Sequence, residues 1–182
     1  MRAASGHGVA PPIVVLTDEE GNPRGTAGRL EAHTGRGLLH KAFSVFVFRE
    51  GGELLIQQRS REKMLWPLYW ANTCCSHPRV GEDLRAAAMR RLEEECGLSC
   101  DLEEAGCFVY RAEEPSGRGV EHEHDTVLVG WVGPDVLPRT DPAEVAAWRW
   151  VRPEALEREI AEEPGRFAPW FRRALEIALG RT

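Results

Sequence analysis

The sequence has no long hydrophobic run and no basic block. No uninterrupted apolar stretch approaches the roughly twenty residues that a membrane span needs, and no charged, apolar and small-residue series marks a signal peptide. Lys and Arg total 23 against 29 Asp and Glu, a net charge of −6, so the electrostatic footprint of a nucleic-acid binder is missing. We expect a cytoplasmic protein without a membrane or nucleic-acid partner, in which any anionic ligand meets a local basic pocket.

The cysteine pattern does not predict a disulfide. The five cysteines are an odd number without a Cys-x-x-Cys pair, and the adjacent Cys74 and Cys75 cannot easily bridge each other, so we expect reduced thiols. Lysine is almost absent, which makes Lys63 more conspicuous than a surface lysine normally is. A chain of 182 residues suits one domain that buries a core without disulfide or metal staples.

The predicted organisation is a flexible N-terminal arm over residues 1–12, rich in Gly, Ala and Pro, followed by a single domain over 13–182. Strands are predicted at 13–17, in an extended piece running toward 28, and at 40–48, 54–59, 107–111, 126–132 and 148–151. Helices are predicted at about 83–96, 153–162 and 167–179. This irregular mixture favours an α/β (α+β) sandwich, with a mixed sheet packed between helices, an additional β-hairpin and C-terminal helices.

The helix predicted over 83–96 begins at a capping residue, Asp83, and ends at Gly97. Its apolar stripe is interrupted by Arg91 and Glu95, which would be costly there unless they were paired, metal-bound or lining a polar cavity. The simplest interpretation is a partly buried Arg91–Glu95 ion pair one helical turn apart, and Glu94 is placed to pair with Arg90.

The same helix resembles the end of the Nudix signature, G-x5-E-x7-R-E-U-x-E-E-x-G-U, where U is aliphatic. The matching positions are Glu82, Arg90, Leu92, Glu94, Glu95, Gly97 and Leu98. Ser76 replaces the opening Gly, and Arg91 replaces the Glu of the R-E pair. The resemblance implies the Nudix fold, whereas Arg91 removes a carboxylate that Nudix hydrolases use to hold their metals.

Histidines and carboxylates form a second candidate constellation. His33 and His40, taken singly, are each more often structural or surface residues, and His77, two residues after Cys75, is a third candidate. The segment Glu121-His122-Glu123-His124-Asp125 is either a solvated loop or an extended chain in which Glu121 and Glu123 share a face. Three imidazoles and two carboxylates would suit a five- or six-coordinate divalent ion such as Zn²⁺, Mn²⁺ or Mg²⁺.

Together these features resemble the type I isopentenyl diphosphate isomerases, a family with the Nudix fold. The segments that carry the resemblance are His33-Thr34 with His40, Trp70-Ala71-Asn72-Thr73-Cys74-Cys75-Ser76-His77-Pro78, the degenerate Nudix helix, Tyr110-Arg111-Ala112, Glu121-His122-Glu123 and Ala168-Pro169-Trp170. They extend over essentially the whole chain from 13 to 179. Within the fold family, the cysteine and Glu-x-Glu motifs are specific to these isomerases.

The resemblance implies a role for each matching residue. It makes Cys75 and Glu123 the opposed catalytic groups, with Tyr110 beside Glu123. It implies a first divalent metal, Zn²⁺, Mn²⁺ or Mg²⁺, held by His33, His40, His77, Glu121 and Glu123. A second ion, Mg²⁺, would bind Glu95 together with the substrate diphosphate, whose phosphates would contact Arg29, Arg59, Lys63 and Arg91. Cys74 should face away from the site, since adjacent residues of an extended segment point in opposite directions.

The implied reaction interconverts isopentenyl diphosphate and dimethylallyl diphosphate, in isoprenoid biosynthesis. A proton is added at C4 and another removed at C2, through a tertiary carbocation that Trp170 would stabilise by up to about 2 kcal/mol. Glu123 is expected to be the acid and Cys75 the base, a nearby cation favouring the thiolate, although the order stays open. Two alternatives remain: a Nudix hydrolase of a nucleoside diphosphate derivative, and a Nudix-like ligand sensor with a structural zinc. The oligomeric state is not predicted.

Overall fold

The structure, a computed structural model, describes residues 12–180. The strands are β1 (Ile13–Thr17), β2 (Pro23–Gly28), β3 (His40–Arg49), β4 (Leu54–Arg59), β5 (Trp70–Ala71), β6 (Cys74–Ser76), β7 (Leu102–Glu113), β8 (Val120–Val132) and β9 (Val145–Val151). The helices are α1 (Arg29–Ala32), α2 (Leu84–Cys96), α3 (Pro153–Glu162), the 3-10 turn η1 (Pro164–Arg166) and α4 (Phe171–Ala178). The predicted arm lies almost wholly outside the described residues, and the division into an arm and one domain stays a prediction. No helix among residues 12–180 is long and apolar enough to cross a membrane.

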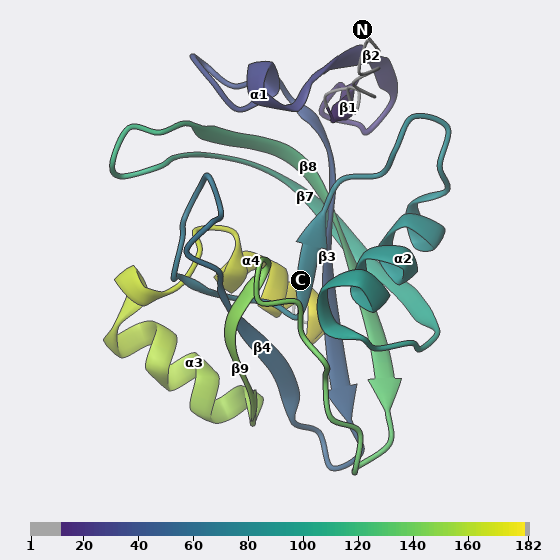
Figure 1. The fold of residues 1–182 in the computed structure, drawn as a ribbon, viewed down its shortest axis with the longest axis vertical. Helices are drawn as coiled ribbons and strands as arrows, with labels where there is room; N and C mark the ends of the chain where they lie inside the picture. Colours follow the sequence, from purple (N-terminus) through teal and green to yellow (C-terminus); the bar gives the residue numbers. More distant parts are fainter. Residues whose placement is uncertain (1–11, 181–182) are drawn as a thin grey trace, which may run out of the picture.

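Strand β3 is the centre of the sheet. Within residues 12–180 the strands form one nine-stranded sheet, in which β3 pairs antiparallel with β1, β4 and β6 and parallel with β8. The long hairpin β7–β8 continues the sheet on one side, and β9 extends it beyond β4 on the other (Figure 1). The result is the mixed sheet that the sequence predicts.

Helices cover both faces of the sheet (Figure 1). On β3, Phe43, Val45 and Val47 pack in a core cluster with the apolar residues of α2, whereas Phe46 and Phe48 pack in a second cluster with α3 and α4. The strand was predicted to be buried on both sides, and it is, because alternate residues point to opposite faces. The predicted α+β sandwich is confirmed.

Helix α2 begins and ends as its sequence predicts. The Asp83 carboxylate accepts a hydrogen bond from the Ala86 N–H at 2.9 Å, and Gly97 ends the helix in the left-handed region at φ 61°. A Cβ at Gly97 would also lie 2.9 Å from the Arg139 carbonyl oxygen, so glycine is required both for backbone conformation and for space.

The hairpin β7–β8 is longer than predicted. The sequence places a polar loop between strands at 107–111 and 126–132, but the strands extend over Leu102–Glu113 and Val120–Val132. The Glu/His run therefore lies inside β8, with Glu121 and Glu123 buried, and its interpretation as a solvated loop is wrong.

The last helix begins later than predicted. Phe167 is extended rather than helical, at φ −111° and ψ 146°, because it pairs with Trp70, and Pro169 in turn disfavours the helical conformation of Ala168. The short elements α1, β5 and β6 were not predicted, since two to four residues are too few to show a periodicity.

Candidate active site and metal centre

A cavity of about 340 Å³ opens where α1, β3, β6 and β8 meet the loop after β4. Most of the residues singled out from the sequence line it: Arg29, His33, Arg59, Lys63, Cys75, His77, Arg91, Tyr110, Glu121, Glu123 and Trp170. The remaining two, His40 and Glu95, are not among the lining residues and have no exposed surface. His40 joins the cluster of histidines beside the cavity, and Glu95 contacts Arg91.

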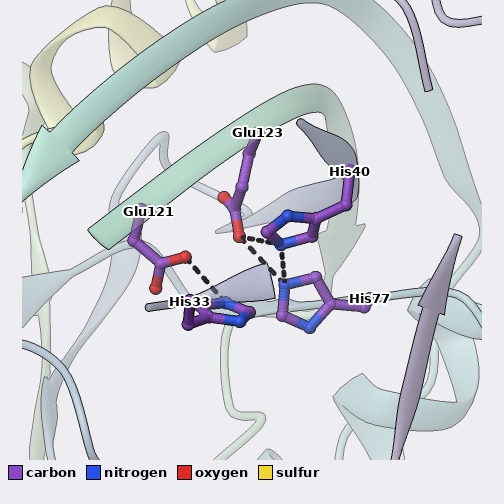
Figure 2. Close-up of side chains that lie close together, drawn as sticks. All are labelled: His33, His40, His77, Glu121 and Glu123. Carbon is purple, nitrogen blue, oxygen red and sulfur yellow. Dashed lines mark hydrogen bonds and ion pairs between the residues drawn. The ribbon is translucent and has the colours of Figure 1, made fainter. Parts of the chain in front are cut away.

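Three histidines and two glutamates from four separate segments meet at this cavity (Figure 2). His33 follows α1, His40 begins β3, His77 follows β6, and Glu121 and Glu123 lie on β8. One ligand atom from each of the five lies within 4.8 Å of every other. The strand register explains part of this arrangement, since His40 and Glu123 are direct neighbours across the parallel β3–β8 pair.

The position of His33 depends on a close backbone approach. The Val120 N–H at the start of β8 donates to the His33 carbonyl oxygen at 2.9 Å. A Cβ on the preceding Gly119 would lie 2.5 Å from that same oxygen, so glycine allows the two segments to touch.

The cluster has the donor set of a divalent metal site. The Nδ1–H groups of His33 and His40 donate to the carbonyl oxygens of Arg29 and Leu38 at 2.6 and 2.7 Å, which fixes the tautomer and turns both Nε2 atoms inward. His33 Nε2 faces Glu121 Oε2 at 2.9 Å, and His40 Nε2 faces Glu123 Oε1 at 3.5 Å. In neutral histidines these Nε2 atoms carry lone pairs, as the carboxylate oxygens that face them do. A cation, either a proton or a metal ion, is therefore needed between each nitrogen and its oxygen.

Burial and mutual charge separate the pKa values of the cluster. Burial and the neighbouring Glu123 charge raise the pKa of Glu121 to about 7. Burial also tends to raise the pKa of Glu123, but the contacts with His40 and His77 outweigh it and hold that pKa well below its ordinary value, so the carboxyl stays ionised. Burial lowers the pKa of His77 to about 4. A neutral His77 beside an ionised Glu123 is the combination that binds a metal. Burial also tends to lower the pKa of His33, but its contact with Glu121 outweighs this and raises that pKa.

Tyr110 completes the Glu123 side of the site. The two residues face each other across the β7–β8 pair, and the Tyr110 hydroxyl donates to Glu123 Oε2 at 2.6 Å. Burial, followed by the negative charge of Glu123, raises the pKa of this phenol well above its ordinary value, so it keeps its proton. The hydroxyl is therefore a permanent donor to the catalytic candidate Glu123.

Cys75 approaches the cavity from β6. It is half-buried and lies opposite Ser44 of β3, whereas Cys74 is fully buried in the core cluster on the α2 side. The prediction that the two cysteines face opposite ways is confirmed. Burial raises the pKa of the Cys75 thiol to about 12. The Arg59 guanidinium, with Nη1 3.5 Å from the sulfur, favours the thiolate as expected but does not outweigh desolvation, so the group carries its proton.

Arg59 and Trp170 form one wall of the cavity. The Arg59 guanidinium lies 5.3 Å above the Trp170 ring and donates to the Leu65 and Trp66 carbonyl oxygens. Trp170 is in turn anchored by its indole N–H, which donates to the buried Asn72 side chain at 3.1 Å. Asn72 lies within one of the segments that carry the family resemblance, but no role was predicted for it.

The predicted Arg91–Glu95 ion pair is present, with 2.5 Å between Arg91 Nη2 and Glu95 Oε1. Glu95 is fully buried, and its second oxygen, Oε2, has no hydrogen-bond partner among the described residues. An unpaired buried carboxylate oxygen is what a cation such as Mg²⁺ would satisfy. The predicted contact of Arg90 with Glu94 also forms, at 3.3 Å, although Arg90 binds Glu82 more closely at 2.8 Å.

Two acidic residues at the site were not predicted. Glu144, just before β9, pairs with both Lys63 and Arg91, and nothing in its local sequence indicates this. Asp125 continues the face of Glu121 and Glu123, with Oδ2 accepting from the Ser44 hydroxyl at 2.7 Å and Oδ1 unpartnered among the described residues. The period-two spacing of Glu121, Glu123 and Asp125 was the signal that could have identified Asp125.

Comparisons with known proteins agree on the fold and on the relatives. A profile described as the NUDIX domain matches residues 38–171. The chain is 48% identical over 165 residues to a Nocardia farcinica protein named isopentenyl-diphosphate Delta-isomerase, covering 91% of this chain and 93% of that one. It is 42% identical over 163 residues to a protein of the same name from Halorhodospira halophila, covering 90% and 93%. Among solved structures, DR0079 from Deinococcus radiodurans shares the fold with a TM-score of 0.67 at 21% identity, over 86% of this chain and 91% of that one.

Proposed function

This chain belongs to the NUDIX family and, within it, to the isopentenyl-diphosphate Delta-isomerases, and on that premise we propose that it interconverts isopentenyl and dimethylallyl diphosphate. The observation that carries the proposal is one cavity lined by a thiol, by a carboxylate with its own hydroxyl donor, and by a cluster of cationic side chains. An allylic isomerase needs these three components and no redox cofactor.

The proposed reaction moves one double bond by two proton transfers. A proton added at C4 converts the C3–C4 alkene into a tertiary cation at C3, and loss of a proton from C2 forms the C2–C3 alkene. Cys75 is the proton-transferring group on one side, and Glu123 with Tyr110 is the group on the other. Each general acid or base of this kind contributes roughly 10²- to 10⁴-fold to the rate. The buried Trp170 ring is the group we assign to stabilise the cation.

The direction of proton transfer depends on the protonation states at the moment of reaction. Burial raises the pKa of Cys75 to about 12, so the proton is on sulfur before the substrate binds. This state favours Cys75 as donor, whereas the Tyr110 hydrogen bond supplies a donor on the Glu123 side. The pH dependence of kcat/KM distinguishes the two: it rises with pH if Cys75 must be deprotonated, and falls if Cys75 must carry the proton.

We propose that the diphosphate binds the cationic end of the cavity. Arg29, Arg59, Lys63 and Arg91 all line it, and Arg side chains match phosphate geometry through paired N–H donors. Anchoring the diphosphate positions a hydrocarbon chain that offers no polar group of its own.

We also propose two divalent ions. His33, His40, His77, Glu121 and Glu123 would hold one, Zn²⁺, Mn²⁺ or Mg²⁺, and Glu95 would hold Mg²⁺ shared with the diphosphate. A bound ion would increase the acidity of a carboxylic acid at Glu123 and neutralise phosphate charge. The site residues themselves orient these groups through the backbone contacts of His33 and His40.

We propose that residues 13–182 form a single domain and that the protein is cytoplasmic. All five cysteines are free, as in proteins of a reducing compartment.

The adjacent cysteines provide a matched test of the proposed function. Cys75→Ala should abolish interconversion while the fold and metal content are retained, because only the cavity thiol is lost. Cys74→Ala removes the same sulfur from the opposite core and should cost about 1 kcal/mol of stability with activity largely kept.

The reaction itself is best followed with isopentenyl diphosphate and Mg²⁺ in D2O. Deuterium in both the allylic product and the recovered substrate supports reversible proton transfer. Activity of Cys75→Ala equal to the unsubstituted protein would refute the role of the thiol. Phosphate release from nucleoside diphosphate derivatives, without isomerisation, would instead support the hydrolase alternative.

A further inference from the structure

Glu144 connects two of the cationic side chains of the cavity. It lies in the turn just before β9 and lines the cavity beside Lys63 and Arg91. Its Oε2 pairs with the Lys63 ammonium, and its Oε1 lies 3.0 Å from Arg91 Nη2. One carboxylate therefore bridges both cations, each through a different oxygen, as two oxygens of a phosphate group could do.

The backbone of Glu144 is held independently of these ion pairs. The Ser60 N–H donates to the Glu144 carbonyl oxygen at 2.9 Å, and the Glu144 N–H donates to the Asp141 carbonyl oxygen at 3.0 Å. The side chain itself is 26% exposed. Its carboxylate can therefore leave the two cations by rotating its side chain, without movement of the turn.

The four cationic residues of the cavity do not share this arrangement. Among residues 12–180, neither Arg29 nor Arg59 forms an ion pair with a carboxylate, although both line the cavity. Lys63 and Arg91 are the two whose charge is already compensated there. A diphosphate that contacts all four therefore competes with Glu144 for two of them.

We propose that Glu144 is an internal competitor for the substrate diphosphate: it pairs with Lys63 and Arg91 when no diphosphate is bound and releases them when the ligand binds. This inference rests on the proposed function, because it takes Lys63 and Arg91 to be diphosphate ligands. It assigns Glu144 a part in binding and none in proton transfer.

Such a competitor suits an isomerase in particular. Substrate and product carry the same diphosphate, so affinity for that group stabilises both equally and does not lower the barrier between them. Excess affinity would slow release of the product, a step that limits many enzymes. A carboxylate that reoccupies the cations would limit that affinity and assist release.

Binding of inorganic pyrophosphate to the full chain, measured by titration calorimetry at one fixed free Mg²⁺ concentration, tests the inference. Glu144→Gln removes the competing charge and should tighten binding about threefold to tenfold, the range expected if two partly exposed ion pairs no longer have to be broken. Glu62→Gln is the matched control. Glu62 lines the same cavity, is exposed, and has no ion pair among the described residues. Its substitution should change affinity less than about twofold.

The outcomes distinguish a failure of the competitor proposal from a failure of the proposed diphosphate site. Tighter binding by Glu144→Gln alone supports the competitor, since a residue that merely held the cations in place would weaken binding when removed. Unchanged or weaker binding overturns it, as does equal tightening by Glu62→Gln, which would indicate net charge alone. If the unsubstituted protein does not bind pyrophosphate, the proposed diphosphate site is refuted as well. Glu144→Ala, with its melting temperature measured, repeats the test if the Gln variant does not fold.

Discussion

The substitution Tyr110→Phe isolates one hydrogen bond of the proposed acid–base pair. It removes the hydroxyl that donates to Glu123 Oε2 at 2.6 Å and leaves the ring in place. The ring packs against Phe108 and Trp170, with centroids 5.5 and 5.9 Å away, and a phenyl ring can keep both contacts. The variant should therefore fold normally, and a change in rate can be attributed to the lost donor.

The expected loss of kcat/KM follows from the negative charge on Glu123, the acceptor of this hydrogen bond. A hydrogen bond to an ionised group contributes about 1.5–3 kcal/mol. If the bond acts fully in the transition state, each 1.36 kcal/mol corresponds to a factor of ten in rate, so kcat/KM should fall about 10- to 150-fold. Because the phenol pKa is raised well above its ordinary value, the hydroxyl stays protonated and the loss should be constant across neutral pH.

The assay is conversion of isopentenyl diphosphate at saturating Mg²⁺, with initial rates measured below KM. The other tyrosine provides the control: Tyr69 is half-buried and does not line the cavity, and Tyr69→Phe deletes the same hydroxyl. Unchanged kcat/KM in Tyr110→Phe would refute the role given to this hydrogen bond. An equal loss in Tyr69→Phe would show that the effect is not specific to the site.

Two further predictions concern metal and pH. Adding Zn²⁺ or Mn²⁺ to metal-free protein should raise Tm, since binding to the native state alone stabilises by about 2.7 kcal/mol at 100 times Kd; His33→Ala should lose this rise, and His124→Ala, on the opposite face of β8 from Glu123, should keep it. An equal rise in His33→Ala would contradict the ligand assignment. Glu82→Gln should cost about 1 kcal/mol at pH 7, because Glu82 and Arg90 are partly exposed and solvent screens their ion pair. The Arg90 hydrogen bonds hold the pKa of Glu82 at about 2, below its ordinary 4.5, so this stability is present above pH 4.5 and is lost as pH falls toward 2; a gap between the unfolding free energies of the two proteins that persists at pH 2 would refute the assignment.

Local sequence patterns predicted those features of the helices and strands that depend on neighbouring residues. The boundaries of α2 follow from one capping side chain and one glycine, and the two-sided burial of β3 follows from its alternating apolar residues. The parallel pairing of β3 with β8 was not predicted, because it joins segments far apart in the chain and neither segment carries a local sequence pattern that identifies its partner. The same pairing explains why the Glu/His run, polar in composition, lies in a buried strand.

The site was recognised mainly because the resemblance named residues that the fold brings together. Periodicity placed Glu121 and Glu123 on one face, but it gave no reason to join them to His33, His40 and His77. Those three reach the cluster through a helix end, a strand start and the residue after a short strand, and each junction depends on tertiary contacts. Spacing along the chain therefore could not have given the cluster without knowledge of the fold.

Arg91 shows why a charge in an apolar stripe is only partly interpretable from sequence. The pattern offered an ion pair, a metal site and a polar cavity as alternatives, and the structure combines two of them: Arg91 pairs with Glu95 and also lines the cavity. A guanidinium has five N–H donors, so one carboxylate does not exhaust it. Arg91 pairs also with Glu94, on the same helix, and with Glu144, which lies 53 positions away along the chain. A hydrophobic pattern can thus locate a charge that needs compensation, but the number and identity of its partners are set by the fold, and under the competitor proposal they determine how strongly the cavity binds an anion.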